Sequence, residues 1–384
     1  MRHFITTLSR GSIQNVIIAF LLLCIVALIF SNENAPVLPK SSPSQFTKVI
    51  NLYRTQTLLD GIVADTAKGP KTYGEILQQV YEPFGYEYDE AEGKNRTPNS
   101  ILFPLKYKRI ECSKVFLDWM DVQIKSNITA DTKDPPPKEI KESEKDLYLL
   151  NGLAQLKSRY INEIPANLPK TMLEPWTNDV IKKYFGYYDN LAWGALPYGG
   201  DCAAVFFALK HFKPTGLTGM VIGSQTPWVE AMVLYHGAAK VITAEYAPLT
   251  VQHPQLAYVH PIEMVKNWQK YTDMDFVVSF SSIEHSGLAR YGDPPDPIGD
   301  LRELSKIFCM LKQGGLLYLG LPSGPDTIEY NVHRIYGYIR WPMIAAGFEF
   351  LGAFFGQNPA VYEKPPPVLK TDYHKQYLFV LQKK

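Results

Sequence analysis

From Gly216 onward, short apolar runs rich in β-forming residues alternate with segments of helix length. This alternation predicts βαβ units around a mostly parallel sheet, because neighbouring parallel strands need a crossover between them. Two further strands are expected after the alternating part, with a long proline-rich loop between them. The expected strands are 219–222, 240–244, 256–260, 276–280, 316–320, 348–355 and 376–382, and the expected helices are 228–235, 262–271 and 300–311.

A second constraint is the apolar run at residues 13–30, which contains no charged side chain. Eighteen residues are just long enough to cross a hydrocarbon layer of ~30 Å. Arg2 and Arg10 precede the run and Glu33 follows it, so residues 1–12 are expected in the cytosol and the remainder in a lumenal or extracellular space. We expect a single-pass signal anchor. A cleaved signal peptide is the alternative, although the residues after the run form a poor cleavage site.

The region between the apolar run and Gly216 is less regular. Residues 31–48 are rich in proline and serine and are expected to form a stem. Residues 49–146 receive no assignment, except that their last part, 131–146, is a charged, proline-containing linker. Helical patterns in residues 147–215 predict a lead-in that packs on the following domain, 216–384.

Other features bear on compartment and partners. Glycosylation sequons begin at Asn95 and Asn127, which agrees with a lumenal glycoprotein. The 39 basic and 38 acidic residues give a net charge of +1, so no global field favours nucleic acid as a partner. The three cysteines outside the apolar run allow at most one internal disulfide and show no metal-ligand spacing, and Cys309 is expected as a buried thiol; the three are Cys112, Cys202 and Cys309.

Four stretches of the C-terminal half stand at or near expected strands. Residues 237–245 enter the second strand and end in an acidic residue, and residues 275–285 carry the fourth strand and end in Glu-His. Residues 311–317 form a Leu-Lys-Gln-Gly-Gly turn, and residues 347–351 enter the sixth strand. These four stretches resemble motifs of the class I S-adenosylmethionine-dependent methyltransferases, whose turn reads Leu-Lys-Pro-Gly-Gly. The resemblance implies a Rossmann-like sheet, mostly parallel with the last strand antiparallel.

A second set of stretches in the same half comprises residues 221–230, 280–287, 290–294 and 330–337. In these stretches the chain also resembles an uncharacterised, nematode-expanded "domain of unknown function" family. That family has no established activity, so this second resemblance implies a fold rather than a reaction.

The methyltransferase resemblance implies S-adenosylmethionine as the cofactor, bound at the carboxyl ends of the strands where the sheet order reverses. Glu245, which ends the second strand, is expected to bind the ribose hydroxyls; otherwise it is an exposed strand-end carboxylate. The first turn departs from the family pattern, because Val221 stands where an acidic residue is usual and Gln225 and Pro227 replace later glycines. The residues expected around the cofactor are Gly223, Ser224, Gln225, Glu245, Tyr246 and Ser281.

Glu284 and His285 are the candidate acid and base, since a histidine suits proton transfer near neutral pH. The alternative is a strand-end pair that only holds the following loop. In that loop, carboxylates could bind a divalent cation, but turn chemistry and a helix N-cap at Gly299 or Asp300 explain them better, and no metal site is expected. The carboxylates are Asp293, Asp296 and Asp300, and the residues that could form a substrate-binding insertion, or merely a helix surface, are Tyr330, Asn331, His333 and Arg334.

Three functions remain open. The first is a membrane-anchored methyltransferase that acts on a lumenal glycan or small polar acceptor. The second is a pseudoenzyme or interaction protein with a degenerate cofactor site. The third is a Golgi-type glycosyltransferase with Asp273-Met274-Asp275 as its DxD motif. However, this triplet stands before the expected strand 276–280, whereas a nucleotide-binding DxD should come after its strand.

Overall fold

The computed structural model describes residues 59–93, 103–125, 135–163, 174–366 and 374–384. The expected membrane segment, the stem and both sequons lie outside these ranges and remain predictions. Among the described residues, no helix combines the length and the apolar character needed to cross a membrane.

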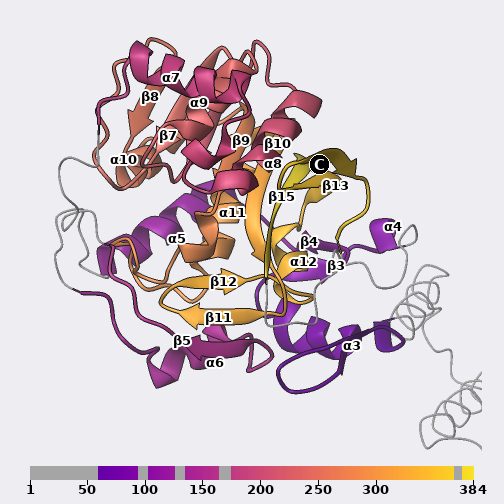
Figure 1. The fold of residues 1–384 in the computed structure, drawn as a ribbon. Helices are drawn as coiled ribbons and strands as arrows, with labels where there is room; N and C mark the ends of the chain where they lie inside the picture. The colour runs from indigo at the N-terminus through magenta and orange to yellow at the C-terminus, as the bar shows by residue number, and fades with distance from the viewer. Residues whose placement is uncertain (1–58, 94–102, 126–134, 164–173, 367–373) are drawn as a thin grey trace, which may run out of the picture. The chain divides into compact units, whose positions relative to one another are not determined.

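An eight-stranded sheet forms the centre of the described chain, in the order β14-β13-β15-β10-β9-β6-β7-β8 (Figure 1). The strands β8, β7, β6, β9 and β10 run parallel to their neighbours, whereas β15 is antiparallel to both β10 and β13. The predicted sheet, mostly parallel with the last strand antiparallel, is therefore confirmed. The bounds are β6 Thr218–Ile222, β7 Lys240–Ala244, β8 Leu256–Val259, β9 Met274–Phe280, β10 Leu311–Ser323, β13 Phe348–Phe355, β14 Asn358–Tyr362 and β15 Lys375–Lys383.

Helices cover both faces of the sheet because successive strand residues point to opposite sides. Val221 and Val278 pack in one hydrophobic cluster with α7 (Asn178–Asp189), α8 (Cys202–His211) and α9 (Trp228–Tyr235). Met220 and Val277 pack in another, on the opposite face. The helices of this second cluster are α5 (Cys112–Lys125), α10 (Pro261–Lys266), α11 (Gly299–Met310) and α12 (Arg340–Ile344).

The order of the sheet reverses beside β6. The chain moves from β6 to β7 and β8 in one direction and then crosses to β9 on the other side of β6. In open parallel sheets, ligands bind outside the carboxyl ends of the strands at such a point. The fold thus places the turns after β6, β7 and β9 together.

Several segments differ from the sequence predictions. The predicted helix 262–271 is the short helix α10 followed by a 3₁₀ turn at Trp268–Tyr271. The lead-in contains α7 and α8, as expected, but also a strand, β5 (Gln155–Ser158). β5 pairs with β11 (Thr327–Tyr330), which forms a hairpin with β12 (His333–Ile335). The region after the fifth strand is therefore a second small sheet and not a helix surface.

Residues 59–93 and 103–125, which received no assignment from the sequence, pack on the sheet's helical layer. They form two two-stranded sheets, the long helix α5 and several short helical turns. The remaining bounds are β1 Val63–Ala64, β2 Lys71–Thr72, α3 Tyr73–Ile76, β3 Tyr86–Tyr88, α4 Glu90–Gly93, β4 Leu105–Tyr107 and, after the linker, α6 Lys145–Tyr148.

Candidate functional site

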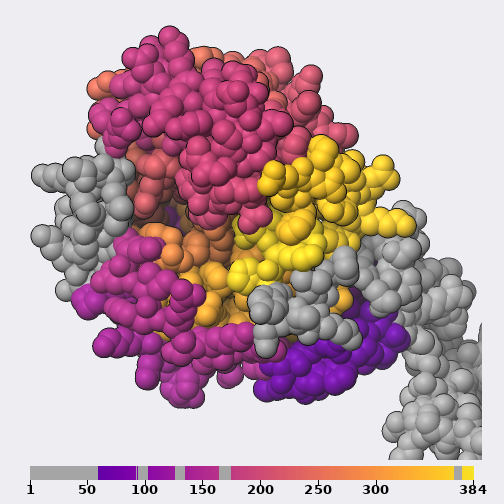
Figure 2. Space-filling view, viewed as in Figure 1, coloured from indigo at the N-terminus to yellow at the C-terminus, as the bar shows by residue number. Residues whose placement is uncertain are grey.

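A cavity of about 340 Å³ lies at the carboxyl ends of β6, β7 and β9. Its volume falls within the range of small-molecule sites. The space-filling view shows the molecule hollowed between the magenta segments and the orange residues below them (Figure 2). Of the residues predicted for the site, seven line the cavity: Gly223, Ser224, Gln225, Glu245, Tyr246, Ser281 and His285. Glu284 is fully buried behind the wall and does not line it.

The turn after β6 requires glycine at its first position. Gly223 has a φ of +72°, a region that side chains rarely adopt. A Cβ atom at Gly223 would lie 1.9 Å from the Ser282 hydroxyl oxygen. The turn after β6 therefore packs directly against the turn after β9. Val221, at the position where the methyltransferases carry an acidic residue, points into the apolar cluster on the other face.

A buried carboxyl group that the sequence analysis did not single out braces this turn. Glu230 of α9 accepts a hydrogen bond from the Ser224 hydroxyl at 3.0 Å and one from the Thr243 hydroxyl at 2.8 Å. Complete burial raises the pKa of Glu230 to about 7. The signal in the sequence was a lone glutamate inside the otherwise apolar helix Trp228–Tyr235.

Glu245 ends β7 and lines the cavity with a side chain that is almost completely buried. One of its carboxylate oxygens accepts the backbone N–H of Ala247 at 2.9 Å. Burial raises the pKa of Glu245, and the backbone amides of Ala247, Tyr246 and Ser224 oppose that rise. The structure therefore places a buried carboxyl group in the cavity wall, rather than an exposed carboxylate at a strand end.

His285 lines the cavity with a fixed ring orientation. Its Nδ1 lies 2.6 Å from the carbonyl oxygen of Val332, so we assign the ring proton to Nδ1, which leaves the lone pair on Nε2. Nε2 lies 3.6 Å from the Glu284 carboxylate. Burial, reinforced by the nearby Arg290 guanidinium, lowers the pKa of His285 to about 3. Burial also raises the pKa of Glu284 to about 7, and one of its oxygens has no hydrogen-bond partner among the residues that the structure describes.

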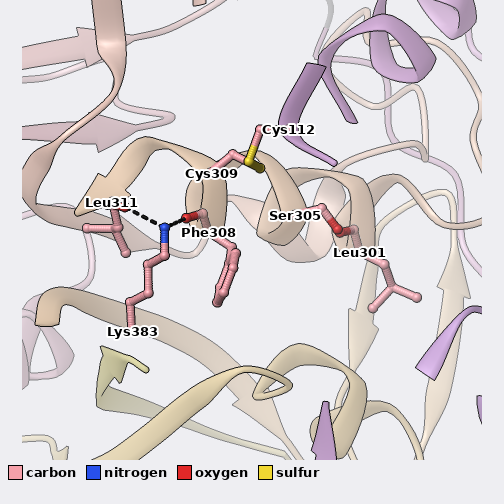
Figure 3. The surroundings of a disulfide bond; sticks show 7 residues. All are labelled: Cys112, Leu301, Ser305, Phe308, Cys309, Leu311 and Lys383. Carbon is pink, nitrogen blue, oxygen red and sulfur yellow. Dashed lines mark hydrogen bonds between the residues drawn. A yellow bond between two sulfur atoms is a disulfide. The ribbon is translucent and has the colours of Figure 1, made fainter. Parts of the chain in front are cut away.

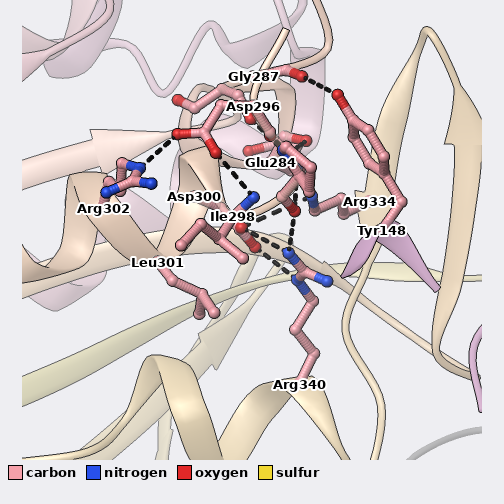
Figure 4. A network of polar contacts seen from close by, with 12 residues as sticks. Tyr148, Glu284, Gly287, Asp296, Ile298, Asp300, Leu301, Arg302, Arg334 and Arg340 are labelled. Atoms are coloured by element: carbon pink, nitrogen blue, oxygen red, sulfur yellow. Dashed lines mark hydrogen bonds and ion pairs between the residues drawn. The ribbon is translucent and has the colours of Figure 1, made fainter. Parts of the chain in front are cut away.

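A buried ionic network holds the loop between β9 and α11 (Figure 4). Asp300 binds the Arg340 guanidinium through both oxygens, at 2.7 and 2.6 Å, and lies 3.5 Å from Arg334. Arg334 also donates to backbone carbonyl oxygens of the loop, among them those of Ser286 and Asp296. Arg334 thus acts as a brace beneath the loop and does not line the cavity.

The other loop carboxylates are turn braces. Asp293 accepts the backbone N–H of Gly287 at 2.6 Å, and Asp296 accepts that of Ile298 at 3.1 Å and pairs with Arg302 at 2.6 Å. In the described ranges, no group of three or more potential ligands could hold a metal ion. Helix α11 begins after Ile298 without a side-chain cap, so the N-cap predicted at Gly299 or Asp300 is wrong by one or two residues.

The predicted insertion residues lie on the β11–β12 hairpin. Asn331 binds the backbone of Ile161 through both atoms of its side-chain amide, at 2.8 Å each. His333 lies 3.1 Å from Glu329, and burial lowers the pKa of His333 to about 4. None of the four, Tyr330, Asn331, His333 or Arg334, lines the cavity.

Three groups of cavity residues were not among the site residues predicted from the sequence. Trp119, Val122 and Gln123 come from α5, a helix far upstream in the chain. Tyr198 and Tyr291 contribute aromatic rings, and Glu303 and Lys306 contribute charges from α11. Their positions depend on tertiary packing, for which no local motif exists.

The Asp273-Met274-Asp275 triplet does not reach the cavity. Asp275 lies at the amino end of β9, where it accepts the backbone N–H of Thr218 at 2.8 Å and pairs with Lys312. The cavity adjoins the other end of the same strand, at Phe280 and Ser281. The described geometry gives this DxD triplet no role in the site.

Residues 216–384 match the family model described as "Caenorhabditis protein of unknown function, DUF268". Solved structures to which parts of this chain are similar include a Burkholderia thailandensis 1,6-didemethyltoxoflavin-N1-methyltransferase with bound 1,6-didemethyltoxoflavin and S-adenosylhomocysteine. It is 13% identical, with 53% of this chain and 87% of that chain covered and a TM-score of 0.35. Another is the N-methyltransferase NodS from Bradyrhizobium japonicum with S-adenosyl-L-homocysteine, at 10% identity, 53% and 97% coverage and a TM-score of 0.33. No curated protein sequence matches the chain.

Proposed function

We propose that the protein binds S-adenosylmethionine in this cavity and transfers its methyl group to a hydroxyl of a lumenal glycan or another small polar acceptor. The observation that carries the proposal is the meeting of three turns in one cavity, with Gly223, Glu245 and His285 each contributing from the end of a different strand. The strand order, with its reversal beside β6, supports the same ligand class.

The residues present fit an adenosyl cofactor. The turn at Gly223 is so close to Ser282 that no side chain fits between them, and this packing joins the turns after β6 and β9 into one continuous part of the lining. Glu245 would accept hydrogen bonds from the ribose hydroxyls. The usual acidic residue of the first turn is absent, and Glu230 supports the turn from behind by holding Ser224.

When bound, S-adenosylmethionine supplies an electrophilic methyl group. The chain's part in the reaction is to orient the acceptor and remove its proton. The acceptor hydroxyl would give its proton to Nε2 of His285, while Val332 holds Nδ1 and so fixes the tautomer. Glu284, when ionised, would stabilise the resulting imidazolium from 3.6 Å. Tyr198 and Tyr291 in the cavity wall offer rings against which a sugar could pack.

The proposed location is the lumen of the secretory pathway or the cell surface, with residues 13–30 as the membrane anchor. The disulfide between Cys112 and Cys309 supports it, since such bonds persist in oxidising compartments. Cys309 is thus half of a disulfide and not the free buried thiol expected from the sequence. The predicted sequons at Asn95 and Asn127 agree with the same location.

Calorimetry on the full chain tests the cofactor. S-adenosylmethionine and S-adenosylhomocysteine should bind, and Glu245→Ala should weaken both by at least about tenfold, because a hydrogen bond to a charged group contributes about 1.5–3 kcal/mol. Glu263→Ala, which removes an exposed carboxylate on α10, is the matched control and should bind as the wild type does. A folded wild-type protein that binds neither compound would refute the proposal.

A pseudoenzyme is the second candidate, favoured by the low pKa of His285, which makes the ring a weak base. Methylation assays with labelled cofactor and glycan acceptors separate the two. A pseudoenzyme with a degenerate cofactor site would form no methylated product, and its affinity for the cofactor would be weak or absent. An enzyme would lose turnover, but not cofactor affinity, in His285→Ala.

A further inference from the structure

Helix α5 forms part of the cavity although it lies about 100 residues before the first strand of the sheet. On this helix, Trp119 is followed three and four positions later by Val122 and Gln123, so the three side chains lie on one side of the helix, and that side lines the cavity. On other sides of the same helix, Leu117 and Ile124 are largely exposed. The cavity wall is thus built from two separate parts of the chain.

Covalent and ionic contacts fix α5 against α11. The disulfide joins Cys112, at the first turn of α5, to Cys309, near the end of α11, across 197 residues of sequence (Figure 3). The indole N–H of Trp119 donates to Glu303 at 2.8 Å. The buried Lys306 pairs with the same carboxylate at 2.8 Å, and its ammonium lies 3.8 Å from the centre of the Trp119 ring.

The α5 wall adjoins the strand end that carries Glu245. The next residue, Tyr246, also lines the cavity and receives a hydrogen bond from the Gln123 side chain. Pro261 and Met264, at the start of α10, complete the same region of the lining. A ribose bound at Glu245 would therefore extend its base toward an aromatic ring, a thioether and an amide.

From this arrangement we infer that α5 is the base-binding wall of the cavity and recognises the planar purine of a nucleoside ligand. The inference rests on the proposed adenosyl cofactor and adds the element that binds its base. Trp119 and Met264 supply apolar surface for the ring faces. Gln123 supplies an amide, which can donate and accept at once and therefore suits the edge of a purine. The Cys112–Cys309 disulfide holds this wall in place, so ligand affinity depends on it.

The first arm of the test is a set of α5 variants in the full chain, with S-adenosylhomocysteine as the probe and calorimetry as the readout. Trp119→Leu should weaken binding at least about fivefold, the smallest effect typical of losing an aromatic–base contact. Gln123→Leu should weaken it less. Leu117→Ala, on the exposed side of the same helix, is the matched control and should leave the affinity unchanged.

The second arm is reduction. A dithiol such as dithiothreitol supplies two electrons and two protons, breaks the S–S bond and leaves two thiols, while the dithiol itself becomes a cyclic disulfide. Reduction should weaken binding of S-adenosylhomocysteine by the wild type. The double variant Cys112→Ser with Cys309→Ser should bind as weakly and show no further response to the dithiol. Cys202, the free cysteine among the described residues, is buried in α8 and leaves the readout unaffected.

The outcomes separate the two proposals. If the wild type does not bind S-adenosylhomocysteine, both the proposed function and the inference fail. If the wild type binds and Glu245→Ala weakens binding, but Trp119→Leu, Gln123→Leu and reduction all match the Leu117→Ala control, the inference alone is overturned. If Cys112→Ser with Cys309→Ser fails to fold, Trp119→Leu still decides, because it leaves the disulfide intact.

Discussion

Two buried carboxyl groups support two neighbouring parts of the cavity wall, and the chemistry of their surroundings differs. Glu230 supports the turn after β6 and is bonded to two neutral hydroxyls, so burial raises its pKa to about 7. Asp300 supports the loop after β9 and lies between two arginines, which hold its pKa below the ordinary value despite complete burial. Burial alone thus does not set the charge of an interior carboxyl group; its partners do.

The difference gives these two parts of the wall opposite responses to pH. Glu230 has a folded-state pKa above its ordinary value of 4.5, so its contribution to stability is complete below about pH 4.5 and is lost as the pH rises through about 7. Asp300 has a lowered pKa, so its contribution is present above its ordinary value of 3.8 and is lost as the pH falls through the folded-state value. Both carboxyl groups therefore contribute to the stability of the cavity wall when the pH is above the ordinary pKa of Asp300, 3.8, and below about 7.

The largest effect is expected from Asp300→Asn. The substitution leaves Arg334 and Arg340 buried without their counter-charge, and breaking a buried pair in this way costs about 3–5 kcal/mol. Urea unfolding at pH 7 measures the loss. Asp189→Asn, at an exposed carboxylate that accepts from Tyr235, is the control and should change the free energy of unfolding by less than about 1 kcal/mol. If both variants lowered the free energy of unfolding equally, the buried arginines would not depend on the charge of Asp300.

A smaller effect, with a sign that depends on pH, is expected from Glu230→Gln. At pH 5 the wild-type carboxyl group is protonated and the variant should be about as stable. At pH 8 the wild type must bury an ionised carboxylate without a cation, so the variant should be more stable by about 1–3 kcal/mol. Unfolding curves at both pH values provide the measurement. A variant that is less stable at pH 8 than the wild type would show that Glu230 is charged and compensated in the fold.

The smallest effect on stability is expected at the periphery of the loop that Asp300 supports, where Arg302 pairs with Asp296. Arg302 pairs with Asp296 at 2.6 Å, but about a quarter of the arginine side chain is exposed. Partly exposed ion pairs contribute about 0–1 kcal/mol, so Arg302→Gln should lower the free energy of unfolding by no more than about 1 kcal/mol, and less still at high salt. A loss as large as that of Asp300→Asn would place Arg302 within the buried network.

Seven of the eight strands of the large sheet could be predicted because each of these seven carries a local signal. Lys240–Ala244 is an apolar, β-branched run after a glycine, and the structure gives the same bounds. β14 and β5 were missed for a physical reason: Asn358–Tyr362 and Gln155–Ser158 are mostly exposed edge strands, without the apolar pattern that burial imposes. Their pairing depends on neighbours that are distant in sequence.

The candidate site, like the sheet, could be predicted only where its residues follow a recognisable strand. Gly223, Glu245, Ser281 and His285 follow strand ends, and parallel topology brings strand ends together without further information. Trp119 and Lys306 were not predictable, because each has an ordinary helical neighbourhood and reaches the cavity only through contacts across the fold. The roles proposed for all of these residues remain predictions for the binding experiments.

The position of β15 has a consequence for the order in which the sheet is assembled. β13 and β14 pair with β10 only by way of β15, which comes after them in the sequence. During vectorial synthesis the β13–β14 hairpin must therefore wait, with one edge unpaired, until residues 375–383 arrive between it and β10. Deleting residues 375–383 removes β15 and should therefore detach β13 and β14 from the sheet, and hydrogen exchange would detect this as lost protection in β13 as well as along one edge of β10.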